Sequence, residues 1–130
     1  MLIRFVVLSI DEDSLRETGV FQAVYHLRDQ GKLHDYEESL LQEVRHWFNA
    51  HLKKPARFTT SKPPYYRKQS RAISWFKESA VEHIAKVRQL AGILEAHDIS
   101  TRMIKTDKPG YVVYEDEYQI VAEPFADSDF

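Results

Sequence analysis

The spacing of apolar residues in the N-terminal part of the chain predicts one strand followed by one helix. Residues 2–10 are almost continuously apolar, branched or aromatic, which is typical of a strand covered on both faces of its sheet. Ser14 and Glu17 have the spacing of a capping box, and apolar residues then recur at helical intervals. Gly31 stands where a helix commonly ends in the left-handed conformation. We therefore predict a helix that begins near Ser14 and ends at about Gln30.

A second helix and a long loop are predicted for the middle of the chain. Asp35 and Glu38 repeat the capping-box spacing, and a wide apolar stripe continues to Leu52. Residues 53–71 contain three prolines and no aliphatic side chain larger than alanine, and they follow neither a helical nor a strand period. The two helices are expected to form an αα-hairpin, followed by a long loop over residues 53–71.

The C-terminal half combines short strands with the clearest helical pattern of the chain. Branched and aromatic residues predict a strand over residues 71–76. Amphipathic spacing predicts a helix over residues 78–97, with one apolar face and one charged face. Three further strands are predicted over residues 100–105, 111–114 and 118–122.

The order of these elements predicts an α+β fold. Pro109 and Gly110 indicate a tight turn before the last two strands, because proline fixes the first central φ and glycine supplies a positive φ at the second. The complete order is β-α-α-loop-β-α-β-β-β. We expect a mixed, largely antiparallel sheet of about five strands together with three helices.

Length and composition agree with a single domain over residues 1–130. The chain has 130 residues, of which 43% are hydrophobic and 29% are charged, values close to those of average globular domains. It has no cysteine, which excludes disulfides and thiolate chemistry and suits a reducing compartment. Arg4 interrupts the apolar N-terminal stretch and acidic residues follow it, which argues against a secretory signal. We predict a soluble cytoplasmic protein, without a prediction of its oligomeric state.

Positive charge is concentrated in residues 53–71, which we call the basic loop. The basic loop holds seven of the 18 Lys and Arg residues and no acidic residue, and three aromatic rings are interleaved with them. Cations neutralise phosphates, and aromatic rings offer faces for unstacked bases, so the composition predicts contacts with single-stranded nucleic acid or with an acidic protein surface. The predicted binding residues are Lys53, Lys54, Arg57, Phe58, Lys62, Tyr65, Tyr66, Arg67, Lys68 and Arg71. The alternative is a solvated loop, or one that folds back on acidic residues of its own chain.

Negative charge is concentrated at the other end of the chain. After Lys108 there are no further Lys or Arg residues, whereas acidic residues recur between Glu115 and Asp129. The last part of this segment is a polar tail over residues 124–130. Such a surface can pair with the basic loop within one chain or between two chains, and the simpler alternative is a solvated hairpin turn and tail.

The sequence contains no motif for a metal, a cofactor or a hydrolase. The six histidines include no i, i+4 pair and have no cysteine beside them, so we predict no metal site. The four glycines are scattered and form no phosphate-binding loop, and no Gly-x-Ser-x-Gly elbow occurs. We therefore predict that the protein uses no cofactor.

One arrangement of polar residues nevertheless suggests catalysis. Arg4 lies in the first predicted strand, Ser74 lies in a middle strand, and the Glu-x-Glu pair of Glu115 and Glu117 precedes the last strand. This order is similar to that of the ADP-ribosyltransferases. The resemblance implies that Arg4 and Ser74 help to hold NAD and that Glu117 stabilises the developing oxocarbenium charge. It covers isolated positions only, since the serine lacks the Ser-Thr-Ser context of that family and the chain is short for that fold.

These observations together favour a small binding protein without catalytic activity, which contacts nucleic acid or an acidic protein through the basic loop. One alternative is a small enzyme built on the Arg, Ser and Glu-x-Glu arrangement. Another is a structural subunit of a protein complex, which would leave an apolar patch exposed on the monomer. The aromatic pairs Trp47-Phe48 and Trp75-Phe76 are assigned to the core.

Overall fold

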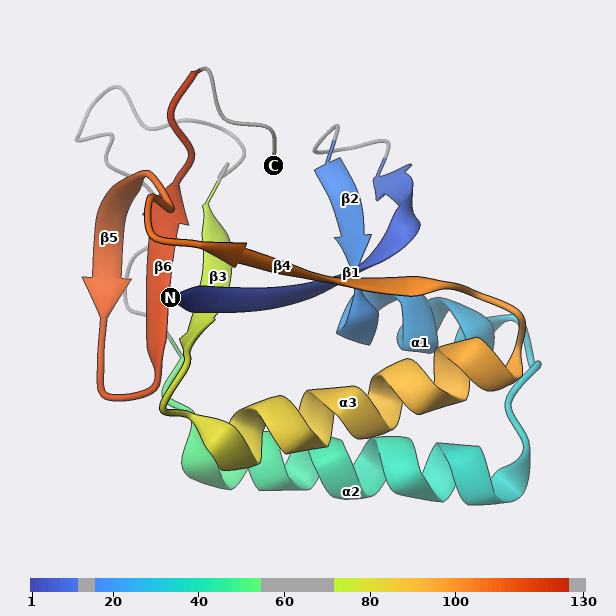
Figure 1. Cartoon of the computed structure of the whole chain (residues 1–130). Coiled ribbons are helices and arrows are strands. Elements are labelled where there is room, and N and C mark those ends of the chain that lie inside the picture. Colours follow the sequence, from blue (N-terminus) through green and yellow to red (C-terminus); the bar gives the residue numbers. More distant parts are fainter. Residues whose placement is uncertain (12–15, 55–71, 127–130) are drawn as a thin grey trace, which may run out of the picture. The chain divides into compact units, whose positions relative to one another are not determined.

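The computed structural model describes residues 1–11, 16–54 and 72–126, and within them the chain forms three helices and six strands (Figure 1). The strand pairs of known register are antiparallel. The predicted α+β class is therefore confirmed, with three helices and a largely antiparallel sheet. In chain order the elements are β1 (Leu2–Asp11), β2 (Arg16–Gly19), α1 (Val20–Asp29), α2 (Asp35–His51), β3 (Ile73–Lys77), α3 (Val81–Ala96), β4 (Thr101–Thr106), β5 (Tyr111–Glu115) and β6 (Gln119–Glu123).

The described residues divide into two compact units, which we call the sheet unit and the helical unit. The sheet unit comprises residues 1–4, 54, 72–80 and 105–126. The helical unit comprises residues 5–11, 16–53 and 81–104. Strands β1 and β4 contribute residues to both units, and they pair with each other. The single domain over residues 1–130 stays a prediction.

In the sheet unit, β3 and β6 form a central antiparallel pair. Ile73 lies opposite Ala122 and Trp75 lies opposite Ile120, while the start of β1 pairs with β3 and β5 pairs with β6. Alternate residues of a strand point to the same face, so Ile73 and Trp75 share one face with their partners on β6. Trp75 is only 1% exposed, which makes this face part of the core and confirms the assignment of that ring.

Gly110 has a conformation and surroundings that only glycine tolerates. Its φ is +126°, which confirms the positive φ expected from the sequence. A Cβ atom at this position would collide with the main chain of Glu123 and Pro124, since β5 begins directly beside the end of β6. The chain can therefore enter β5 in this way only with glycine at position 110.

Gly110→Ala is expected to lower the free energy of unfolding by about 2 to 4 kcal/mol, because the substitution combines backbone strain with a main-chain collision. Urea unfolding followed by circular dichroism measures this change. Gly92→Ala is the matched control: Gly92 is exposed in α3 and a Cβ there meets nothing within 4 Å. We expect that control to raise stability by up to about 1 kcal/mol. Equal effects of the two substitutions would contradict this interpretation of Gly110.

In the helical unit, α3 packs against both α1 and α2, and Figure 1 shows α2 and α3 side by side. The apolar face predicted for the third helix is buried against these neighbours, as Leu90 and Leu94 are fully buried. A ring contact between Phe21 of α1 and Phe48 of α2, with centroids 5.1 Å apart, joins the other two helices. The three helices of this unit are therefore in contact with one another.

The first helix begins later than the sequence pattern predicts. Residues Arg16–Gly19 form β2, which pairs antiparallel with β1, and α1 begins at Val20. The predicted capping role of Glu17 is therefore wrong, and Ser14 lies outside the described residues. The physical reason is that the main chain of this segment finds its partners on β1, which the local spacing of residues does not reveal.

Candidate nucleic-acid interface

Two aromatic rings are stacked at the C-terminal end of α2. Trp47 is half-buried and His51 is exposed, and their ring centroids lie 4.4 Å apart with only 13° between the planes. The two residues are four apart, which places them on the same face of the helix. His51 Nδ1 donates a hydrogen bond to the carbonyl oxygen of Trp47 at 2.8 Å, which fixes the orientation of the imidazole ring. We call this pair the Trp47–His51 stack.

Two buried side chains, Phe48 and His83, contact the indole ring of the Trp47–His51 stack. Phe48 meets the indole ring edge-on, with centroids 5.2 Å apart. His83 of α3 is buried, contacts the indole ring edge-on at 4.7 Å, and donates a hydrogen bond from Nε2 to the carbonyl oxygen of His51 at 2.9 Å. This bond satisfies one of the carbonyl groups left open at the end of α2. Side chains from both α2 and α3 therefore pack against the stack.

Positive charge surrounds this end of α2. Lys86, one turn after His83 on α3, lies with its Nζ 5.8 Å from the centre of the Trp47 ring, within the range of a cation–π contact. Lys53 and Lys54 follow directly after Leu52, the C-cap of the helix, and both are exposed. Cations at a helix C-terminus are stabilised by the partial negative charge of its carbonyl groups. The end of α2 thus presents stacked rings and lysine side chains together.

The predicted binding residues are only partly described. Lys53 and Lys54 lie where the sequence predicts, at the start of the basic loop. The other residues of the set lie outside the described residues: Arg57, Phe58, Lys62, Tyr65, Tyr66, Arg67, Lys68 and Arg71. The basic loop as a binding element therefore stays a prediction.

Sequence reasoning missed the residues that precede the basic loop. Trp47 was assigned to the core with Phe48, which is correct for Phe48 but leaves out the stacking of the indole ring on exposed His51. The i, i+4 spacing of Trp47 and His51 is the signal that indicates this contact. Lys86 gives no such signal, because only the packing of α3 on α2 brings it to the ring.

The four residues of the predicted catalytic arrangement lie in the sheet unit, but the strand register separates two of them. Ile3 lies opposite Phe76, so their side chains point to the same face of the sheet. Ser74 is two residues from Phe76 and shares that face, whereas Arg4 follows Ile3 and points to the other face. The structure therefore does not bring Arg4 and Ser74 together.

Two of the three acidic residues before β6 make contacts within the sheet unit. Glu115 forms an ion pair with Lys77 at 2.7 Å. Asp116 accepts hydrogen bonds from the backbone N–H groups of Tyr118 and Gln119 and from the Tyr114 hydroxyl. Glu117 is exposed.

The hydrogen bonds at this turn also change the ionisation of two side chains. Burial raises the pKa of the Asp116 carboxyl, but the hydrogen bonds from Tyr118, Gln119 and Tyr114 outweigh burial, so the pKa of Asp116 is lowered overall. The same contact with Asp116 raises the pKa of the Tyr114 hydroxyl. Asp116 therefore remains a carboxylate that organises the turn, which is a structural role.

A buried carboxylate connects the N-terminal end of α2 to the C-terminal end of α3. Glu37 is 1% exposed, and its two oxygens accept hydrogen bonds from His97 Nε2 at 2.9 and 3.1 Å. Glu37 also accepts the backbone N–H of His34, the N-cap of α2, at 3.0 Å. The helix therefore begins one residue earlier than the predicted Asp35 and Glu38 spacing, with Glu37 in the role expected for Glu38.

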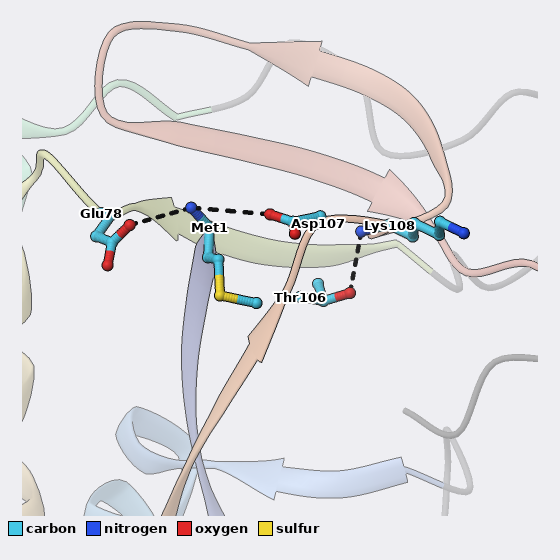
Figure 2. A network of polar contacts seen from close by, with 5 residues as sticks. All are labelled: Met1, Glu78, Thr106, Asp107 and Lys108. Atoms are coloured by element: carbon cyan, nitrogen blue, oxygen red, sulfur yellow. Dashed lines mark hydrogen bonds and ion pairs between the residues drawn. The ribbon is translucent and has the colours of Figure 1, made fainter.

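Figure 2 shows a further polar network, which belongs to the sheet unit. The amino group of Met1 lies 3.1 Å from Glu78 Oε2 and 3.9 Å from Asp107 Oδ1. The backbone N–H of Lys108 donates to Thr106 Oγ1 at 3.0 Å. The hydrogen bond and the charge of the amino group lower the pKa of Glu78. All these carboxylates are exposed, so the network fixes the ends of local segments and encloses no site.

A wide depression on the outer face of α2, of about 570 Å³, does not have the character of a binding site. Every lining residue comes from this single helix, so no second element shapes the depression. Its acidic side chains would repel a phosphate. The lining residues are Asp35, Glu38, Ser39, Gln42, Glu43 and His46.

Comparison of the chain with protein-family models, with curated proteins and with solved structures found no match. Among the described residues, no group of three or more His, Asp or Glu side chains is placed to hold a metal ion. None of the helices in the described ranges has the length and apolar character needed to cross a lipid bilayer.

Proposed function

We propose that this chain is a nucleic-acid-binding protein without catalytic activity, which contacts phosphate groups through the basic loop. The observation that carries the proposal is the density of charge in residues 53–71, which hold seven cations and no acidic side chain. Cations at this density release the counterions of a nucleic acid on binding, which is the main source of affinity that does not depend on sequence. The structure supports the proposal at the start of the loop, where Lys53 and Lys54 are exposed.

The surface beside the loop has a compatible charge. Lys86 lies next to Trp47, so α3 adds a cation to the end of α2 from which the basic loop leaves. The partial negative charge of a helix C-terminus alone would repel a phosphate. The exposed lysines after Leu52 oppose this repulsion.

Two carboxylates near the C-terminal end of the chain already have partners in the sheet unit, which favours an external anion for the basic loop. Glu115 is already paired with Lys77, and Asp116 is saturated by donors of its own turn. Moving either carboxylate to the basic loop would break contacts that the sheet unit makes locally. A nucleic acid competes for the loop without this cost.

Fluorescence anisotropy of a labelled single-stranded 20-mer, as DNA and as RNA, tests the proposal with the unmodified protein. Between 50 and 200 mM salt the affinity is expected to fall by at least about tenfold, since three or more phosphate contacts on a single strand give that slope. Absence of binding at 50 mM salt, or binding that salt does not weaken, would contradict the proposal. If polyglutamate displaces the oligonucleotide at equal charge concentration, an acidic protein is the better candidate partner.

A further inference from the structure

We propose that the Trp47–His51 stack is a base-stacking platform, so that the ligand is single-stranded nucleic acid whose bases contribute to binding. This inference rests on the proposed function, because the basic loop must first hold the phosphates. It goes further in assigning a site to described residues and in predicting that a polyanion without bases binds less tightly.

The geometry of the stack suits this role. The two rings are nearly parallel, and among all ring contacts of the described residues the imidazole of His51 has only the one with Trp47. Because His51 is exposed, its outer face is directed to solvent, and a base placed there would extend the column of rings by one member. A base inside a duplex is covered on both faces by its neighbours and cannot take this position.

The stack is organised before any ligand arrives. The bond from His51 Nδ1 to the Trp47 carbonyl fixes the imidazole, and the edge-on contacts of Phe48 and His83 fix the indole. Ordering flexible side chains at an interface costs free energy on binding. Here folding has already ordered the Trp47 and His51 side chains, so their loss of conformational entropy does not reduce the affinity for the ligand.

Two lysines lie close to the Trp47–His51 stack, where they could contact the phosphates of a nucleic-acid strand. Lys53 follows His51 by two residues, and Lys86 lies over the indole ring. Two residues of chain span at most about 7 Å, so the Lys53 backbone stays near the platform. Cations and stacked rings therefore occur together at this end of α2, a combination found in grooves that bind single strands.

The competing explanation is that the ring pair only stabilises α2. A pair at i, i+4 contributes a few tenths of a kcal/mol to a helix. That role does not need a buried histidine from another helix beneath the stack or a lysine above the indole. It also predicts no effect of His51 on ligand binding, which makes the two explanations separable.

The test compares a single-stranded 12-mer with an abasic 12-mer of the same length and with heparin, by anisotropy competition at 50 mM salt. His51→Ala removes the exposed ring, and His46→Ala is the control, since His46 is exposed on the same helix outside the stack. We expect His51→Ala to weaken binding of the base-containing strand by about tenfold while leaving the abasic strand and heparin unchanged. His46→Ala is expected to leave all three affinities unchanged.

Tryptophan fluorescence gives a second, independent measurement. Binding of the base-containing strand is expected to quench Trp47, whereas Trp75 is buried and stays unquenched. Trp47→Phe should therefore remove the quenching, with circular dichroism as the check on folding. Equal affinity for the normal and abasic strands would overturn the proposed role of the stack in binding bases. The same holds if His51→Ala does not change the affinity for the base-containing strand. Either result would leave the proposed phosphate binding intact. Failure of all three polyanions to bind would overturn both proposals.

Discussion

Glu37→Ala is expected to lower the free energy of unfolding by about 2 to 4 kcal/mol, because it removes a buried carboxylate that accepts hydrogen bonds from two partly buried donors and leaves a cavity in its place. His97 Nε2 and the His34 backbone N–H both donate to this carboxylate, so one substitution opens the start of α2 and releases the end of α3. Urea unfolding monitored at 222 nm measures the change. Glu38→Ala is the control, since Glu38 is exposed one residue further along α2 and should change stability by less than about 0.5 kcal/mol.

The pH dependence of the same contact has a definite sign. Burial raises the pKa of Glu37, but the hydrogen bonds from His34 and His97 and the charge of His97 outweigh burial, so the pKa is lowered below its ordinary value of 4.5. A lowered pKa stabilises the folded state above the ordinary value, and this contribution is lost as pH falls through the folded pKa. The stability of the unmodified protein should therefore fall below about pH 4.5 more steeply than that of Glu37→Gln. Parallel curves would show that folding leaves the pKa of Glu37 unchanged, which would contradict the lowered pKa.

The elements that the sequence predicted well are those whose signal is local. The helix predicted over residues 78–97 appears as α3, Val81–Ala96, because its apolar face recurs at helical spacing throughout. Gly110 was predicted correctly because a positive φ selects glycine at a single position. Alternation and turn residues likewise placed β5 and β6 within a residue or two.

The elements that the sequence did not predict depend on partners far along the chain. Glu17 has the spacing of a helix cap, yet its segment pairs with β1 as a strand. Glu37 and His97 are 60 residues apart, so neither position indicates the other. Lys86 reaches Trp47 only through the packing of two helices. The spacing of residues within a segment indicates its local secondary-structure preference, whereas these contacts form only when the segment packs against distant parts of the chain.

The candidate interface shows the same division. Composition alone identified the basic loop, because charge and aromatic content need no fold to be counted. The i, i+4 spacing of Trp47 and His51 indicates the ring contact, but the exposure of each ring required the structure, since a half-buried indole and a fully buried one look alike in sequence. The Trp47–His51 stack precedes the basic loop in the chain. In the proposed complex, the stack contacts bases and the loop contacts phosphates.

Simultaneous replacement of Lys53, Lys54, Arg67 and Lys68 by serine is expected to weaken binding of a single-stranded 20-mer by more than about hundredfold at 50 mM salt. Each phosphate contact on a single strand contributes about 0.7 to the slope of log K against log salt, so loss of four should flatten that slope by about 3. Anisotropy titrations at four salt concentrations between 50 and 300 mM measure both quantities.

The control for this variant removes the same amount of charge elsewhere. Lys32, Arg45, Lys105 and Lys108 are exposed and lie outside the basic loop, so their replacement by serine gives the same net charge. If long-range attraction alone drives binding, both variants weaken it equally, because net charge then decides the affinity. If the basic loop makes the contacts, the control keeps the original slope of log K against log salt and only its association rate falls. Equal slopes for the two variants would therefore show that the basic loop is not the binding element.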